Sequence, residues 1–280
     1  MTRGGEATRA NVVRNARAER DRLARWTATR DQCWAFVGPL IRAGADVAIV
    51  GAGKGHTVPL RRIGERAGRL TLIDLDPTSA RAARRRIALR QRRRVDVIEH
   101  DVTGGLADRI VGHARDGSRV DVPAGVALPL PGAPYDVVIG DLLYTQLVYP
   151  GLLDAGLPQH EIRATLTRTG QPLVDLVVAR IHASIAPDGV AVHLHDPISW
   201  RDDRPQPVLL ASILEAGSTD RALQLLHAGT LVGSGDVRAS VLNDPRVEIA
   251  GQARWRWPFS PEIDYLVWAI ATRPRGPATG

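Results

Sequence analysis

The chain has 280 residues, of which 44% are hydrophobic and 24% charged, with 27 Gly and 19 Pro. This apolar content excludes an intrinsically disordered chain, and glycines without a regular period exclude a collagen-like one. A single cysteine, Cys33, excludes an internal disulfide framework and a zinc site of several thiolates. We expect Cys33, in an apolar stretch beside Trp34, to be a buried structural thiol.

The net charge of +7 is unevenly distributed along the sequence. Residues 1–100 carry 22 basic and 10 acidic side chains, whereas residues 101–280 carry 15 basic and 20 acidic ones. All basic residues except Lys54 are arginine, a bias that codon usage can produce as readily as selection. The high isoelectric point alone therefore does not establish nucleic-acid binding.

No apolar run reaches the ~18 residues that a transmembrane helix needs, and the N-terminal segment lacks the apolar core of a secretory signal. We expect a cytoplasmic protein with no membrane partner.

Two helices are predicted before the first strand. Residues 8–26 contain good helix formers and a thin apolar stripe, and a second helix is expected to begin at Thr29, whose hydroxyl can cap it, and to end near Val37. Gly38 and Pro39 should disturb that second helix. Together these segments predict an N-terminal helical cap over residues 1–43.

From Val47 onward, short apolar runs alternate with helical segments. Near-continuous β-branched runs indicate strands buried on both faces, and hence an α/β fold with a doubly wound, mostly parallel sheet. The five runs are Val47–Val50, Leu70–Ile73, Val95–Ile98, Tyr135–Ile139 and Gly189–Leu194. Helices are expected at residues 57–65, 106–113, 207–215 and 221–227.

The C-terminal segments predict a different arrangement. Gln252–Trp257 and Asp264–Ala271 read as strands with too little chain between them for a crossover helix, so an antiparallel hairpin should end a seven-stranded sheet. Residues 197–250 are longer than an α/β unit needs and are predicted to cover a substrate pocket. Residues 273–280 are expected to be a flexible tail.

The strongest motif is Gly51-Ala-Gly53-Lys-Gly55, which follows a predicted buried strand and precedes a helix. Glycines in this context let a ligand approach the main chain. The dinucleotide fingerprint requires a sixth-position glycine, where this chain has His56, and the P-loop requires Ser or Thr after Lys54, where it has Gly55. Each of the two pyrophosphate-binding motifs is therefore excluded by one residue.

The remaining pattern, G-x-G-x-G after an apolar strand, resembles the class I S-adenosylmethionine-dependent methyltransferases, with their Rossmann-like fold, over about residues 30–271. The resemblance implies that Gly51, Ala52, Gly53 and Gly55 wrap the methionine part of S-adenosyl-L-methionine. It further implies that Asp74 with Leu75 binds the ribose hydroxyls, that Asp101 with Val102 reads the adenine, and that Asp141 borders the transferred methyl group. The methyltransferase domain would comprise residues 44–272. By contrast, Asp76, which precedes Pro77, is predicted to be a helix N-cap.

Three residues after the fourth and fifth strands are the candidates for the acceptor side of the reaction: Asp141, Tyr144 and His195. Asp141-Leu-Leu-Tyr144 resembles the Asp/Asn-Pro-Pro-Tyr/Phe motif of amino-group methyltransferases, but leucines replace both prolines, which weakens that inference. Asp141 is expected to border the methyl group, Tyr144 to pack on the acceptor, and His195 to remove a proton from a hydroxyl acceptor. No metal site is predicted, because pairing His193 and His195 with Asp196, or Asp141 with Asp196, lacks a further well-spaced ligand.

Eight arginines between residues 81 and 94 can neutralise phosphates, but interleaved aromatics are absent there and the predicted fold places this helix near the sheet edge. We therefore expect a small-molecule or peptide acceptor. An RNA or DNA methyltransferase, a non-catalytic protein and an aminopropyl transferase on the same fold remain alternatives. The sequence does not specify the oligomeric state.

Overall fold

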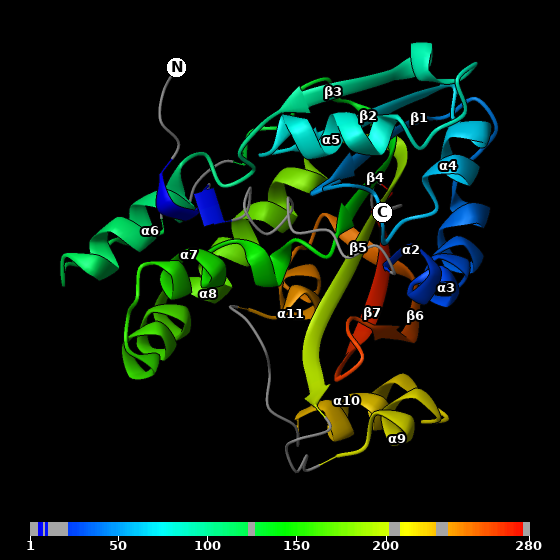
Figure 1. Cartoon of the computed structure of the whole chain (residues 1–280). Helices are drawn as coiled ribbons and strands as arrows, with labels where there is room; N and C mark the ends of the chain where they lie inside the picture. Colours follow the sequence, from blue (N-terminus) through cyan, green and yellow to red (C-terminus); the bar gives the residue numbers. More distant parts are fainter. Residues whose placement is uncertain are drawn as a thin grey trace.

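The computed structural model describes residues 5–7, 9–10, 22–122, 127–201, 208–227 and 235–276. Its centre is a seven-stranded sheet in the order β3-β2-β1-β4-β5-β7-β6 (Figure 1). β1 to β5 are parallel, and β7 runs antiparallel to both β5 and β6. The strands are β1 (Asp46–Val50), β2 (Arg69–Asp74), β3 (Val95–Glu99), β4 (Tyr135–Asp141), β5 (Ile185–Arg201), β6 (Val247–Pro258) and β7 (Ile263–Pro274). The predicted fold class, including the reversed C-terminal hairpin, is confirmed.

Alternate residues of the central strands face two separate hydrophobic cores. In β1, Val47 and Ile49 face one core, while Ala48 and Val50 face the other. This double burial explains why the strands read as continuous apolar runs rather than as an alternation.

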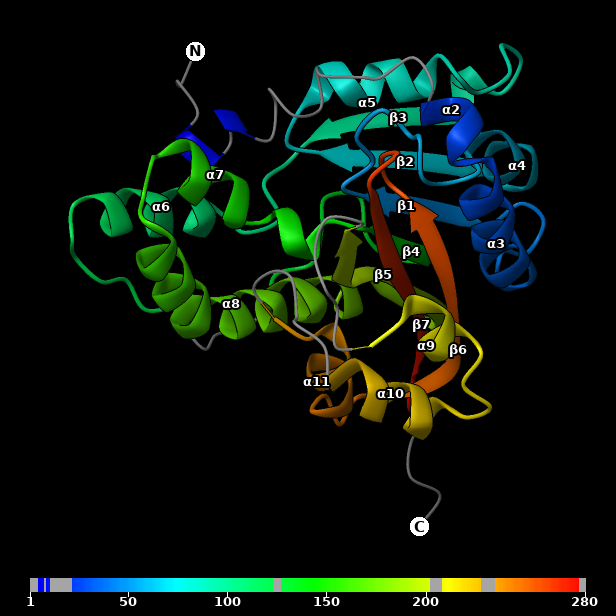
Figure 2. The same cartoon turned by 60° about the horizontal axis from the view of Figure 1, so that its bottom comes forward.

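Helices cover both faces of the sheet (Figure 2). The first core contains residues of α3 (Thr27–Val37), α4 (Leu60–Arg66) and α5 (Pro77–Arg84). The second contains residues of α6 (Leu106–Arg115), α7 (Tyr149–Asp154), α8 (Gln159–His182), α9 (Leu210–Leu214), α10 (Thr219–His227) and α11 (Val237–Leu242). None of the described helices has the length and apolar character of a membrane span.

The predicted N-terminal cap lies partly outside the described residues, which omit 1–4, 8 and 11–21. The part from α2 (Arg22–Arg25) onward packs on the end of the C-terminal hairpin, where the indole of Trp26 donates a hydrogen bond of 2.8 Å to the carbonyl of Pro258. The described residues before it lie elsewhere, with the amide of Gly5 donating to Asp108 of α6. Cys33 and Val37 are buried in the first core. Residues 26–37 therefore share a core with the sheet.

Several predicted boundaries were wrong by a few residues. α3 begins at Thr27, so Thr29 lies inside the helix, where its hydroxyl donates to the carbonyl of Arg256 instead of capping. α4 begins at Leu60 rather than Thr57. The predicted tail starts too early, because β7 continues to Pro274 and the amide of Arg275 still bonds to the carbonyl of Arg246.

The arginine cluster lies on α5 and the turns leading to β3, at one edge of the sheet (Figure 1). Two of its members brace the local backbone: Arg84 donates to the carbonyl of Arg92, and Arg92 donates to that of Ile87. Ala83 and Ile87 face the core, whereas Ala82 is half-buried.

Candidate functional site

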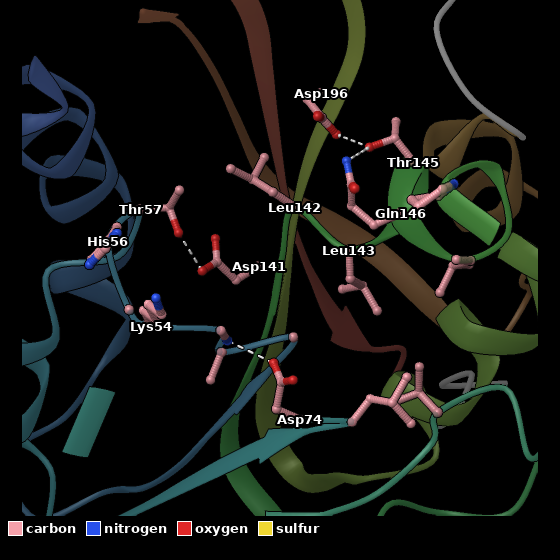
Figure 3. Close-up of a pocket in the computed structure, with 18 of the residues that line it drawn as sticks. Lys54, His56, Thr57, Asp74, Asp141, Leu142, Leu143, Thr145, Gln146 and Asp196 are labelled. Atoms are coloured by element: carbon pink, nitrogen blue, oxygen red, sulfur yellow. Dashed lines mark hydrogen bonds between the residues drawn. The ribbon is translucent and has the colours of Figure 1, made fainter. Parts of the chain in front are cut away.

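A cavity of about 460 Å³ opens where the carboxyl ends of the parallel strands meet. In open α/β sheets this edge is where ligands bind. All nine residues predicted to contact a cofactor line this one cavity: Gly51, Ala52, Gly53, Gly55, Asp74, Leu75, Asp101, Val102 and Asp141. Figure 3 shows Asp74 and Asp141 with their hydrogen bonds.

The glycine loop follows β1 and needs glycine for two physical reasons. Gly51 and Gly55 have φ angles of +74° and +63°, in the left-handed region that other residues rarely adopt. A Cβ on Gly51 would lie 2.9 Å from the Cβ of Leu143, and one on Gly55 would lie 2.0 Å from a methyl carbon of Leu60. The loop thus presents bare backbone to the cavity.

Asp74 ends β2 directly beneath this loop. One of its carboxylate oxygens accepts a 2.7 Å hydrogen bond from the amide of Gly53, and the other accepts one of 2.8 Å from the amide of Asp76. Burial raises the pKa of Asp74, and these amide hydrogen bonds oppose the rise. Asp76 caps α5 by accepting from the amides of Thr78 and Ser79, as predicted.

Asp101 lies after β3 and organises the turn into α6. Its two oxygens accept hydrogen bonds from the amide and hydroxyl of Thr103 and from the amide of Gly105. Asp101 also lines the cavity, beside His100 and Val102. The Asp101 carboxylate therefore holds the turn before α6 in place, and Asp101 itself is part of the cavity lining.

Asp141 ends β4 and is only 5% exposed. Its Oδ2 accepts a 2.6 Å hydrogen bond from the hydroxyl of Thr57, while its Oδ1 has no hydrogen-bond partner within the described structure. Burial, with a smaller contribution from the charge of Asp74, raises the pKa of Asp141 to about 7, although the hydrogen bond from Thr57 opposes the rise. The next residue, Leu142, has a φ of +50°, a conformation that is costly for a leucine.

Tyr144 and His195 do not line the cavity, which corrects the predicted acceptor site. Tyr144 is 1% exposed, and its hydroxyl lies 2.6 Å from Nδ1 of His193 within the second core. His195 is also buried, its Nε2 has no partner among the described residues, and burial lowers its pKa to about 4. A neutral imidazole sealed from the cavity cannot take a proton from an acceptor there.

Asp196, which sequence reasoning considered only as a metal ligand, occupies the place expected for His195. It lines the cavity, is 1% exposed and accepts a 2.9 Å hydrogen bond from the hydroxyl of Thr145. Burial raises its pKa to about 7, and the charge of Asp141 adds to the rise. We call Asp141 and Asp196 the acidic pair. The sequence signal for Asp196 was its position immediately before Pro197, just after the predicted apolar run Gly189–Leu194.

Four aromatic side chains form a continuous wall of the cavity, which we call the aromatic wall: Trp26, Trp257, Phe259 and Tyr265. The ring of Trp257 lies 5.1 Å from that of Trp26 and 5.2 Å from that of Phe259. The guanidinium of Arg22 lies 5.3 Å from the ring of Trp26 and 5.6 Å from that of Phe259, within cation–π distance. The sequence analysis missed this wall because it joins α3 to a hairpin more than 200 residues away.

Basic side chains also reach the cavity, at Arg22, Lys54 and His56. Burial lowers the pKa of His56 to about 4, and the nearby cations Arg86, Arg22, Lys54 and Arg30 contribute. The eight clustered arginines lie outside the cavity lining.

Two further expectations concern the surroundings of the cavity. The described residues between 197 and 250 do not line it, so the predicted covering role fails for that part, and residues 202–207 and 228–234 lie outside the described structure. In the described portion of the chain, no three His, Cys, Asp or Glu side chains are grouped as a metal site would require.

No protein-family model and no curated protein matches the sequence. Among solved structures, the chain is similar to the ribosomal protein L11 methylase of Lactobacillus delbrueckii subsp. bulgaricus, with 13% identity and a TM-score of 0.45 over 89% of this chain and 80% of that one. It is similar to LepI in complex with S-adenosylhomocysteine and a substrate analogue, with 14% identity and a TM-score of 0.40 over 83% of this chain and 43% of LepI. It is also similar to DhpI in complex with S-adenosylhomocysteine, with 14% identity and a TM-score of 0.38 over 97% of this chain and 98% of that one.

The strand order supplies the assignment of the fold. Five parallel strands follow the order 3-2-1-4-5, the seventh is inserted antiparallel before the sixth, and a glycine loop follows β1. With this topology, the chain has the Rossmann-like fold of the class I S-adenosylmethionine-dependent methyltransferases.

Proposed function

We propose that this protein transfers a methyl group from S-adenosylmethionine to a small-molecule or peptide acceptor. The observation that carries the proposal is the convergence, in one cavity, of the glycine loop with Asp74, Asp101 and Asp141. These residues come from four different strand ends and line one cavity, which supports the proposed cofactor site.

The residues present fit this cofactor. Gly51, Gly53 and Gly55 line the cavity without side chains, so the methionine part can lie against the main chain. Asp74 would accept from the ribose hydroxyls, and Asp101 with Val102 would border the adenine. Arg22 and Lys54, which also line the cavity, would balance the cofactor's carboxylate.

The cofactor supplies an activated methyl group on a sulfonium. The protein's contribution is then to hold the nucleophile, methyl carbon and sulfur in line, which removes most of the entropic cost of the encounter.

Calorimetric titration tests the cofactor. S-adenosylhomocysteine should bind, whereas NAD and ATP should bind much more weakly, because the loop lacks both pyrophosphate motifs. Tight binding of NAD with no response to S-adenosylhomocysteine would refute the proposal.

Aminopropyl transfer is the second candidate, because Asp196 supplies the second buried carboxylate that a polyamine acceptor would need. Arg22 and Lys54 instead favour a cofactor that keeps its carboxylate. 5′-Methylthioadenosine, which lacks the amino-acid part, separates the two: a methyltransferase should bind S-adenosylhomocysteine more tightly, whereas an aminopropyl transferase should not. The arginine cluster gives the nucleic-acid alternative no comparable support, since it does not line the cavity.

A further inference from the structure

We propose that the methyl acceptor is an amine carried on a planar apolar group, bound between the acidic pair and the aromatic wall, and that Asp196 receives the proton that the amine releases. This inference rests on the proposed function and specifies its acceptor.

The acidic pair favours a positively charged ligand. Each carboxylate is more than nine-tenths buried, and the described structure supplies each with one threonine hydroxyl, from Thr57 or Thr145. Oδ1 of Asp141 has no partner in that part of the chain, although its residue lines the cavity. A buried carboxylate oxygen without a hydrogen bond is costly, so a donor from the ligand would satisfy it.

The acidic pair lies on the acceptor side of the cofactor site. In Figure 3, Asp141 lies between Asp74 and Asp196. The charge of Asp74 acts on the pKa of Asp141, and that of Asp141 acts on the pKa of Asp196, in agreement with this order. Under the proposed function Asp74 binds the ribose of the cofactor and Asp141 borders its methyl group. A ligand group beside Asp196 would then approach the methyl group from the side opposite the ribose.

The aromatic wall supplies the rest of the site. Its rings pack edge to face and present an apolar surface that suits a planar group. The guanidinium of Arg22 already lies over two of these rings, so the wall accommodates a cation within the molecule. Aromatic faces and carboxylates together select for an amine over a neutral hydroxyl.

The side chains predicted from the sequence to serve a hydroxyl acceptor do not line the cavity of the described structure. His195 and Tyr144 are not among the residues that line it, and the lining residue His56 has its pKa lowered to about 4 by burial and nearby cations. Asp196 is instead the buried proton acceptor at the acceptor side, with a pKa raised to about 7 by burial. That pKa suits exchange of a proton near neutral pH.

The reaction balances as follows. The bound ammonium gives one proton to the Asp196 carboxylate, which frees the nitrogen lone pair. That lone pair forms a bond to the methyl carbon while the carbon–sulfur bond breaks and its electrons stay on sulfur. The products are a methylated ammonium and the neutral thioether S-adenosylhomocysteine, and the proton on Asp196 passes to solvent when the products leave.

The test compares amines with alcohols of the same skeleton on the full chain saturated with S-adenosylhomocysteine. Isothermal titration with 2-phenylethylamine and tryptamine, against 2-phenylethanol and tryptophol, should show at least one amine binding about 10-fold or more tightly than its alcohol, the difference a charge-assisted hydrogen bond provides. Asp196→Asn should abolish that preference without changing the affinity for S-adenosylhomocysteine. Glu161→Gln, an exposed change on α8, is the matched control and should preserve the preference.

The outcomes separate the two proposals. If S-adenosylhomocysteine does not bind, the proposed function fails. If it binds but neither amine does, or amines and alcohols bind equally to the wild type, the amine proposal is overturned while the proposed function stands. The wild-type comparison decides this even if Asp196→Asn does not fold, and persistence of the preference in a folded Asp196→Asn would refute the role of Asp196.

Discussion

The hydroxyl of Thr57 donates a 2.6 Å hydrogen bond to Oδ2 of Asp141 and so ties the segment after the glycine loop to the end of β4. The two residues are 84 positions apart in sequence. This bond fixes one oxygen of Asp141 and leaves the other facing the cavity. Proline disfavours the helical conformation of the residue before it, so Pro59 accounts for α4 starting at Leu60 rather than at Thr57.

Thr57→Val should therefore destabilise the protein by about 1–3 kcal/mol, because it leaves a second buried carboxylate oxygen of Asp141 without a donor. The pKa of Asp141 should rise further, since the bond from Thr57 lowers it. Chemical denaturation measures the stability, and Thr57→Ser, which keeps the hydroxyl, is the control. Equal losses in both variants would show that the hydrogen bond is not responsible.

Asp74→Ala should weaken binding of S-adenosylhomocysteine by about 1–3 kcal/mol, because buried ribose hydroxyls would lose their acceptor. The matched control is Asp96→Ala on neighbouring β3, where Asp96 forms an exposed ion pair with Arg69 outside the cavity. Calorimetry should show a loss for the first variant and none for the second. An unchanged affinity in folded Asp74→Ala would remove Asp74 from the cofactor site.

The acidic pair should make the ligand-free protein less stable as pH rises. Burial raises the pKa of Asp196 in the folded state to about 7 from 3.8, so its contribution to stability is complete below pH 3.8 and is lost as pH rises through 7. Between these values the folded state holds the extra proton, and the loss is at most about 1.4 kcal/mol per pH unit.

Buried histidines act in the opposite direction, since burial lowers the pKa of His182, His193 and His195 and their contribution is lost as pH falls from 6.5. The measurement is therefore the difference in unfolding free energy between Asp196→Asn and wild type from pH 5 to pH 8. As pH rises, the unfolding free energy of Asp196→Asn should increase relative to that of the wild type. A difference independent of pH would contradict the raised pKa.

Tyr144→Phe should cost about 1–3 kcal/mol of stability, because Nδ1 of His193 would lose its partner inside the core. His193 in turn contacts His182, which contacts Asp244, so the loss falls on a buried polar chain. Affinity for S-adenosylhomocysteine should stay unchanged, since Tyr144 lies outside the cavity lining. A stable Tyr144→Phe with lost acceptor binding would restore the role predicted from the sequence.

The sequence predicted the features that depend on short stretches of chain. The five parallel strands were visible because β-branched runs buried on both faces leave a continuous apolar signal. The nine positions that the family resemblance assigned to a cofactor line one cavity, as strand ends of a parallel sheet allow. The Asp76 cap was predictable because it needs only the next three residues.

The acceptor side was predicted less well because it depends on the direction of individual side chains. Leu142 adopts a φ of +50°, and beyond this turn Leu142 and Leu143 line the cavity while Tyr144 faces the core. His195 was predicted at the site because it follows the predicted fifth strand, but β5 continues to Arg201 and that ring is buried.

The sequence by itself thus determined the sheet, the glycine loop and the carboxylates at the strand ends, since each is encoded by neighbouring residues. Only the tertiary structure decided that Asp196 replaces His195 in the cavity and that Trp26 meets Trp257 and Phe259 to form the aromatic wall. The physical reason is that these contacts join segments up to 233 residues apart, and packing between such segments leaves no periodic trace in either one.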